Sequence, residues 1–232
     1  MRRTLFAVLI LMGGSTVARA QCGFGAWNGG LVNDDPTLIH PSTTVAAAFP
    51  PTACGMEVVL DTVPAPPPGN ARVGMSVIDT SPVAEKRYRA RFYLNPRDYD
   101  PGIAFTHRRL HLMLAQASTN IRFLQIELRR VVAGGPFSIV AGLREDGTTT
   151  RRVVVSPDFS PNTWHYVEFD LQLATGPASA DGRFEAWLDG VSWGLTTAFQ
   201  NYQSGLAVDY VRLGAMKAEE GANGTIYLLS EH

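Results

Sequence analysis

Short segments in which apolar and polar residues alternate follow one another from about residue 71 to the end of the chain, and they constrain the fold more than any other feature. In segment 87–94, for example, apolar side chains occupy every second position: Tyr88, Ala90, Phe92 and Leu94. Successive side chains of a strand point to opposite faces of a sheet, so this pattern predicts a half-buried β-strand. The same pattern predicts strands at 71–79, 87–94, 109–116, 122–130, 137–143, 149–155, 164–173, 183–188, 208–215 and 225–229.

These strands indicate which side chains share a face. The segment 109–116 places Leu110, Leu112 and Leu114 together, and 122–130 places Leu124 with Ile126 and Leu128. These ten short strands, with no amphipathic helix of about twelve residues or more, favour an all-β sandwich with one core between two antiparallel sheets. We therefore predict a two-sheet antiparallel jelly-roll sandwich. An immunoglobulin-like domain needs only about 100 residues, and two of them would need a central linker that the sequence lacks.

The first 20 residues have the three parts of a cleaved secretory signal peptide. Two arginines precede an apolar run at 5–12, and small residues end the segment at Ala18 and Ala20. The apolar run is too short to span a bilayer. We expect cleavage near Ala20, a secreted or periplasmic protein, and no transmembrane segment.

The charge of the chain limits its partners. The whole chain has 20 Lys+Arg and 21 Asp+Glu, a formal net charge of −1. The predicted signal contains three arginines and no acidic residue, so the mature chain would carry 17 basic and 21 acidic residues, or −4. A mildly acidic protein offers no bulk attraction to nucleic acid, which we exclude as a partner.

Cys22 and Cys54 are the two cysteines of the chain. In an oxidising compartment such a pair most simply forms one disulfide, which closes a loop of about 30 residues and stabilises the fold by about 3 kcal/mol. The segment 21–54 shows no sustained period of 2 or 3.6. We expect it to form an irregular N-terminal cap, held by the disulfide, ahead of the jelly roll at 55–232.

Three pairs of segments resemble known jelly-roll proteins. Trp164–Phe169 (WHYVEF) and Gly182–Gly190 (GRFEAWLDG) resemble paired strands of laminin G-like, concanavalin A-like domains. Similarity to a group of uncharacterised bacterial secreted proteins of this fold rests on 77–82 with 87–94 and on 211–214 with 224–227. The resemblance covers about residues 55–232 and implies a concanavalin A-like fold. It implies no single function, because this sandwich hosts lectins, glycosidases, lyases and adhesion domains.

Two pairs of acidic residues have the spacing that a glycosidase needs. Glu168 with Asp170, and Glu185 with Asp189, have spacings that place two acids on one strand face, as a glycosidase needs. Laminarinases of the concanavalin A type carry three acids at alternate positions of one strand, and this sequence has no such run. We therefore predict no catalytic residue.

Histidine and glutamine positions are the other candidates for chemistry. His107 and His111 have the spacing of a helical zinc pair, but the surrounding pattern is that of a strand, so we assign no metal site. Polysaccharide lyases of this fold pair an arginine-rich strand with a Gln/His pair and a catalytic tyrosine. The segment Gln125–Arg130 (QIELRR) resembles that arrangement only superficially.

A row of arginines is the strongest candidate binding feature. Arginine supplies 18 of the 20 basic residues, and Arg87, Arg89 and Arg91 project from the solvent face of one predicted strand with Tyr93 beside them. Guanidinium groups bind carboxylates and sulfates with two hydrogen bonds, so this row could accept an acidic glycan. Two further candidates lie on the polar face of predicted strand 122–130: Gln125 and Glu127.

Calcium is a candidate cofactor, since Asn33–Asp35 and Asp79 could supply oxygen ligands. The sequence indicates no other cofactor. Together, these features predict a secreted, non-catalytic module that binds a carbohydrate or cell-surface ligand. A polysaccharide-active glycosidase or lyase is the alternative, and a structural envelope protein is the third reading.

Overall fold

The computed structural model describes residues 29–41, 56–64, 73–102, 109–132, 134–147 and 151–230. These residues form fourteen strands and one turn of 3-10 helix at Gln203–Gly205. Within them, no helix is long and apolar enough to cross a membrane. The predicted signal peptide and both cysteines, Cys22 and Cys54, lie outside the described residues.

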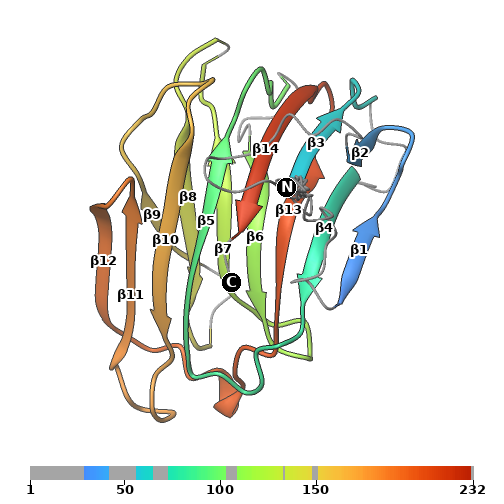
Figure 1. The fold of residues 1–232 in the computed structure, drawn as a ribbon. Coiled ribbons are helices and arrows are strands. Elements are labelled where there is room, and N and C mark those ends of the chain that lie inside the picture. Colours follow the sequence, from blue (N-terminus) through green and yellow to red (C-terminus); the bar gives the residue numbers. More distant parts are fainter. Residues whose placement is uncertain are drawn as a thin grey trace, which may run out of the picture.

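The strands form two seven-stranded antiparallel sheets that lie as two layers, with sheet B in front of sheet A in Figure 1. Sheet A has the order β1 (Gly30–Asn33), β4 (Val73–Asp79), β13 (Tyr210–Ala218), β6 (Arg109–Gln116), β7 (Arg122–Arg129), β8 (Ser138–Arg144), β9 (Arg151–Val155). Sheet B has the order β12 (Val191–Phe199), β11 (Gly182–Leu188), β10 (His165–Gln172), β5 (Arg87–Asn95), β14 (Gly224–Ser230), β3 (Met56–Leu60), β2 (Ile39–Pro41). The predicted all-β, two-sheet jelly-roll sandwich is confirmed.

Four strands were not predicted. The short strands β1 and β2 lie inside the segment for which we expected an irregular cap, and they extend the two sheets by pairing with β4 and β3. A strand of three or four residues is too short to show a period in the sequence. The other two, β3 and β12, also escaped detection; β12 contains a glycine and two register shifts against β11, which interrupt alternation.

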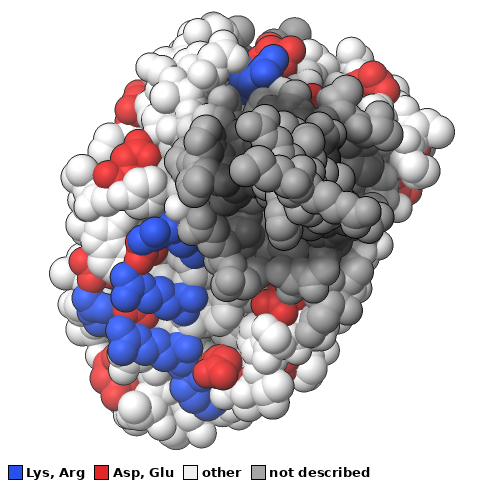
Figure 2. All heavy atoms as spheres, viewed as in Figure 1, with Lys and Arg blue, Asp and Glu red and all other residues white. Residues whose placement is uncertain are grey.

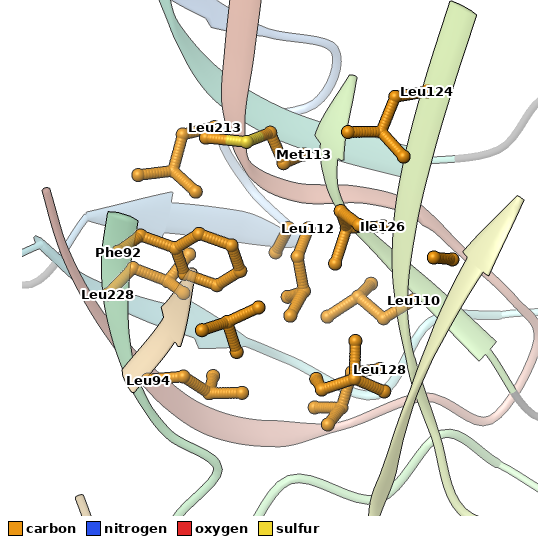
Figure 3. Packing of buried hydrophobic residues seen from close by; sticks show 14 of the residues in the cluster. Phe92, Leu94, Leu110, Leu112, Met113, Leu124, Ile126, Leu128, Leu213 and Leu228 are labelled. Carbon is orange, nitrogen blue, oxygen red and sulfur yellow. The ribbon is translucent and has the colours of Figure 1, made fainter. Parts of the chain in front are cut away.

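The core lies between the two sheets. Figure 3 shows Phe92 and Leu94 of β5 facing leucines of sheet A, among them Leu110 and Leu128. All four side chains are fully buried. Burying a side chain of this size contributes about 1.5 to 3 kcal/mol, so the strand faces that carry these residues are held inward. The intervening residues of β5, β6 and β7 must therefore point out of the sandwich.

Bulges in β6 and β13 change which side chains face outward. The β6–β7 register shifts between His111 and Met113, and Leu112 and Met113 both belong to the core. Beyond the shift, Leu114 pairs with Gln125 and lines a cavity instead of joining the core. The expectation that Leu114 shares a face with Leu110 and Leu112 is wrong, because an extra residue in the strand inverts the alternation after it.

Candidate functional site

Four polar side chains meet on the outer face of sheet A, and we call them the His111 cluster: Arg109 and His111 of β6, Gln125 and Glu127 of β7. His111 Nε2 lies 3.0 Å from Gln125 Nε2 and 3.4 Å from Glu127 Oε1. Arg109 Nη1 lies 2.9 Å from Glu127 Oε2, and the Gln125 amide also donates to Glu127. His111, Gln125 and Glu127 are 9%, 4% and 6% exposed. The cluster is a buried polar network on neighbouring strands.

The contacts of His111 suit a group that gains and loses a proton. An amide N–H donates, so Gln125 can donate to Nε2 when the imidazole is neutral. A carboxylate accepts, so Glu127 can take a hydrogen bond from Nε2–H when the ring is protonated. Arg109 holds Glu127 in place through the other carboxylate oxygen. Both protonation states of His111 therefore have a partner in the cluster.

A cavity of about 490 Å³ lies on the same face beside the cluster. Its lining combines three basic residues, one acid and three apolar residues: Arg122, Arg212, Lys217, Asp34, Val32, Leu114 and Met216. In the sheet register, Met216 is the partner of His111 and Leu114 is the partner of Gln125, so the cavity adjoins the cluster. Its excess of cations suits a ligand with negative charge.

Arg212 is held by the sheet beneath it. Its Nε and Nη2 donate to Ser76 Oγ at 3.0 and 2.8 Å. These bonds fix the guanidinium group before any ligand binds, while the planar fork retains further donors. A preorganised cation of this kind loses little conformational entropy on binding an anion.

The arginine row predicted on the solvent face lies on sheet B, the opposite sheet. Arg87, Arg89 and Arg91 do point outward, with side chains 62%, 61% and 44% exposed. Their guanidinium groups are bound to acids of the neighbouring strand β10: Arg87 to Asp170, and Arg89 and Arg91 to Glu168. In Figure 2, basic side chains form a column with acidic ones between them on the face that sheet B turns to the viewer.

The six predicted binding residues thus do not form one site. The three arginines and Tyr93 belong to β5 of sheet B, whereas Gln125 and Glu127 belong to β7 of sheet A. Tyr93 is 8% exposed, so it does not stand beside the arginines as an open ring. Sheet topology explains the separation, since β5 and β7 belong to different sheets and each sheet turns its polar face away from the shared core.

The predicted acid pairs of sheet B have structural partners. Hydrogen bonds from Arg91 and Arg89 hold the pKa of Glu168 below its ordinary value, and the Arg87 hydrogen bond lowers that of Asp170. A glycosidase's general acid needs a raised pKa, so this pair is unsuited to that role.

The second acid pair is likewise engaged within the fold. Glu185 binds Arg183. Asp189 accepts hydrogen bonds from His165 and the Tyr166 backbone N–H, at 2.7 and 3.0 Å, in the turn that joins β11 to β12. With Glu185 and Asp189 so occupied, neither acid pair favours hydrolysis.

The candidate metal ligands do not gather. Among the described residues, no three His, Cys, Asp or Glu side chains come close enough to hold a metal ion. His107 lies outside the described residues, and His111 belongs to the cluster. Of the proposed calcium ligands, Asp35 accepts hydrogen bonds from Thr37, and Asp79 accepts one from the Ser81 backbone. These carboxylates cap their own turns.

Comparison with known proteins gives structural neighbours only. No family model matches the chain, and no curated protein matches it in sequence. The endo-β-1,4-glucuronan lyase of the fungus Trichoderma reesei is 12% identical, with a TM-score of 0.60 over 83% of this chain and 85% of that one. A mutated alginate lyase in complex with alginate trisaccharide is 9% identical, with a TM-score of 0.56 over 88% and 94%. An alginate lyase of Chlorella virus is 13% identical, with a TM-score of 0.52 over 89% and 91%.

These neighbours share the jelly-roll sandwich, and they correct one prediction. We expected a non-catalytic ligand-binding module, but the glucuronan lyase and both alginate lyases are polysaccharide-cleaving enzymes. The comparison contradicts that expectation.

Sequence reasoning missed most of the site on sheet A. It selected Gln125 and Glu127 but assigned no role to Arg109, and it considered His111 only as a zinc ligand. The sequence signal that could have indicated this site was the Gln125–Arg130 segment, which resembles a lyase strand only superficially. It contains the glutamine but not the histidine of a Gln/His pair. The structure supplies that histidine from the adjacent strand β6, opposite Glu127.

Proposed function

We propose that the chain is a polysaccharide-degrading enzyme that cleaves an anionic polysaccharide by β-elimination on the outer face of sheet A. The observation that carries this proposal is the contact of His111 with Gln125 and Glu127 beside a cavity lined by Arg122, Arg212 and Lys217. A proton-exchanging group and a cationic pocket adjoin each other on one sheet face. β-Elimination from a uronate needs both.

The reaction sets clear chemical requirements. A base removes the proton from the sugar carbon next to the carboxylate, and the electron pair forms a double bond to the neighbouring carbon. The bond from that second carbon to the glycosidic oxygen breaks, and the oxygen takes up a proton. Negative charge builds up on the carboxylate in the transition state, so cations that neutralise it lower the barrier.

The residues of the site match these requirements. Neutral His111 is the base in this proposal, since its Nε2 accepts a hydrogen bond from Gln125 and can instead accept a proton. Glu127 stabilises the imidazolium that results, and Arg109 holds Glu127 in position through its contact with Oε2. The basic residues of the cavity bind the uronate carboxylate.

Two further observations support the proposal. Gln116, on β6 next to the cavity residue Arg122 in the register, has a buried Oε1 without a hydrogen-bond partner among the described residues. An acceptor left open in this way suits a site that takes a hydroxyl-rich ligand. The structural neighbours are lyases of glucuronan and alginate, which are anionic polysaccharides.

Several predictions made from sequence belong to the same proposal. Export by the signal peptide at 1–20 would bring the enzyme to polymers outside the cytoplasm. A Cys22–Cys54 disulfide would suit that compartment. The likeness to laminin G-like proteins and any binding of calcium stay predictions for experiment.

The test is to incubate the chain with polyglucuronate and with alginate and to follow two products. Elimination forms a double bond conjugated to the carboxylate, which absorbs in the ultraviolet, whereas hydrolysis releases reducing ends without that absorbance. We expect both signals to rise together. Reducing ends without absorbance, or no cleavage of any uronate polymer, would overturn the proposal.

Variants assign the role of the histidine. His111→Ala should lower kcat at least about 100-fold, as expected for the loss of a general base. His40→Ala is the matched control, because His40 lies on sheet B and pairs with Asp61 at 3.6 Å. Full activity in His111→Ala, or an equal loss in both variants, would exclude His111 as the base.

A further inference from the structure

We propose that sheet B carries a second, non-catalytic surface that binds an anionic polysaccharide. The surface, which we call the arginine strip, consists of four residues: Arg87, Arg89 and Arg91 of β5, and Arg183 of β11. It lies on the outer face of the sheet opposite the His111 cluster. The proposal is independent of the catalytic function proposed above, since it rests on the charge and geometry of this face alone.

Arginines and acids lie at different depths in this surface. The side chains of Glu168 and Asp170 are 11% and 5% exposed, whereas those of Arg87 and Arg89 are 62% and 61% exposed. The acids therefore lie beneath the guanidinium groups. A ligand that approaches this part of sheet B meets the arginine side chains first, in the basic column that Figure 2 shows with acidic atoms between its members.

The guanidinium groups keep donors for a ligand. Arg87, Arg89 and Arg91 each contact their acid through Nε and Nη2. A guanidinium group has five N–H donors, so these bonds leave part of each fork to bind another anion. The buried acids meanwhile fix the side chains, which reduces the entropy lost on binding.

The spacing of the strip suits a polymer. Alternate residues of a strand lie about 7 Å apart, so the three arginines of β5 form a regular row of cations along the strand. Two aromatic rings flank the row: Arg89 Cζ lies 5.7 Å from the ring centre of Trp187, and Arg91 Cζ lies 5.2 Å from that of Tyr166. A flexible chain with a repeated carboxylate and apolar sugar faces matches this arrangement.

Stabilisation of the sheet does not account for all of these charges. The four arginines of the arginine strip face three acids, Glu168, Asp170 and Glu185. Two of the arginines share the single carboxylate of Glu168. The excess positive charge is therefore available to an external anion. Although the chain as a whole is acidic, this part of its surface favours ligands that carry negative charge.

The test compares two variants that leave the net charge unchanged. The strip variant combines Arg87→Gln, Arg89→Gln, Glu168→Gln and Asp170→Asn. The control, Arg97→Gln with Asp98→Asn, removes one cation and one anion beside β14 of sheet B, outside the strip. Affinity for polyglucuronate is measured by affinity electrophoresis in a His111→Ala background, with dextran as the uncharged polymer.

We expect the strip variant to lose at least about fivefold in affinity for polyglucuronate, the control to lose none, and neither to bind dextran. Unchanged affinity in the strip variant, or an equal loss in the control, overturns the proposal. Added Arg122→Gln reports the cavity of sheet A, and if the two sites are independent each substitution removes only the binding that its own sheet contributes. A protein without lyase activity but with this binding pattern would refute only the catalytic proposal.

A second variant keeps the test valid if the strip variant does not fold. Arg87→Lys, Arg89→Lys and Arg91→Lys retain every charge but lose the planar fork. We expect severalfold weaker binding of polyglucuronate at unchanged net charge. Binding as tight as that of the unmodified strip would refute recognition by the guanidinium groups.

Discussion

Replacing Arg109 with methionine tests whether Glu127 is an ionised, buried member of the His111 cluster. Methionine keeps much of the length of the arginine stem but removes the charge and the 2.9 Å contact with Glu127 Oε2. The Glu127 side chain is 8% exposed and that of Arg109 is 29% exposed. The substitution therefore leaves a carboxylate with little access to water and without its cation.

The expected loss follows from that burial. Removing one partner of a buried ion pair costs about 3 to 5 kcal/mol, and the partial exposure of Arg109 places this case at the low end, about 3 kcal/mol. For a chain of this size, that loss corresponds to a fall in Tm of about 6 to 12 °C. Urea denaturation at pH 7 measures the free energy of unfolding directly.

Arg129→Met is the matched control. Arg129 is the register partner of Arg109, and its Nε donates to Ser138 Oγ at 3.3 Å. Loss of such a bond costs about 1 kcal/mol. Adding Glu127→Gln to Arg109→Met should restore much of the lost stability, because no charge is then left buried. Equal losses in the two arginine variants, or no recovery in the double variant, would refute this account.

The remaining predictions concern packing and pH. In Gly214→Ala the new Cβ would lie 2.1 Å from Met75 O, so β13 and β4 must separate. We expect urea denaturation to show that the free energy of unfolding falls by more than about 3 kcal/mol. The control is Gly134→Ala, whose Cβ meets nothing within 4 Å and which should lose only about 1 kcal/mol; equal stability of the two variants would contradict the clash. The pKa values of Glu168 and Asp170 are lower in the folded protein than their ordinary values of 4.5 and 3.8. Their ion pairs therefore stabilise the fold at pH values above the ordinary pKa values, and this stabilisation is lost as the pH falls through the lower folded values. Melting curves from pH 7 to pH 3 should therefore fall below about pH 4.5, and more shallowly in a Glu168→Gln, Asp170→Asn variant; an unchanged slope would show that these carboxylates do not carry the effect.

The fold was predictable because alternation is a local property. In β5 the apolar positions Phe92 and Leu94 face the core, as their spacing indicates, and the Asp189-Gly190 pair makes the turn after β11 as expected. Alternation alone could not reveal the bulge in β6, since the extra residue is apolar like its neighbours. Leu114 was consequently placed on the wrong face.

The candidate site was less predictable because it depends on register between strands. Gln125 and Glu127 were selected as polar residues on one strand face, but their partner His111 comes from β6 and Arg109 from the same strand two residues earlier. The cavity beside them joins residues near 32, 114–122 and 212–217, which only the order β1, β4, β13, β6, β7 brings together. No local pattern contains that order.

By itself, the sequence determined the class of fold and the polar or apolar character of most strand faces, because burial of alternate side chains is decided residue by residue along each strand. The tertiary structure decided which polar residues meet. It placed Arg87 and Gln125 on opposite sheets, set Glu168 and Asp170 beneath arginines that lie about 80 positions earlier in the chain, and brought His111 into contact with Gln125. Charge and proton exchange depend on distances of a few ångströms between strands, and those distances are fixed by register and bulges that alternation does not encode.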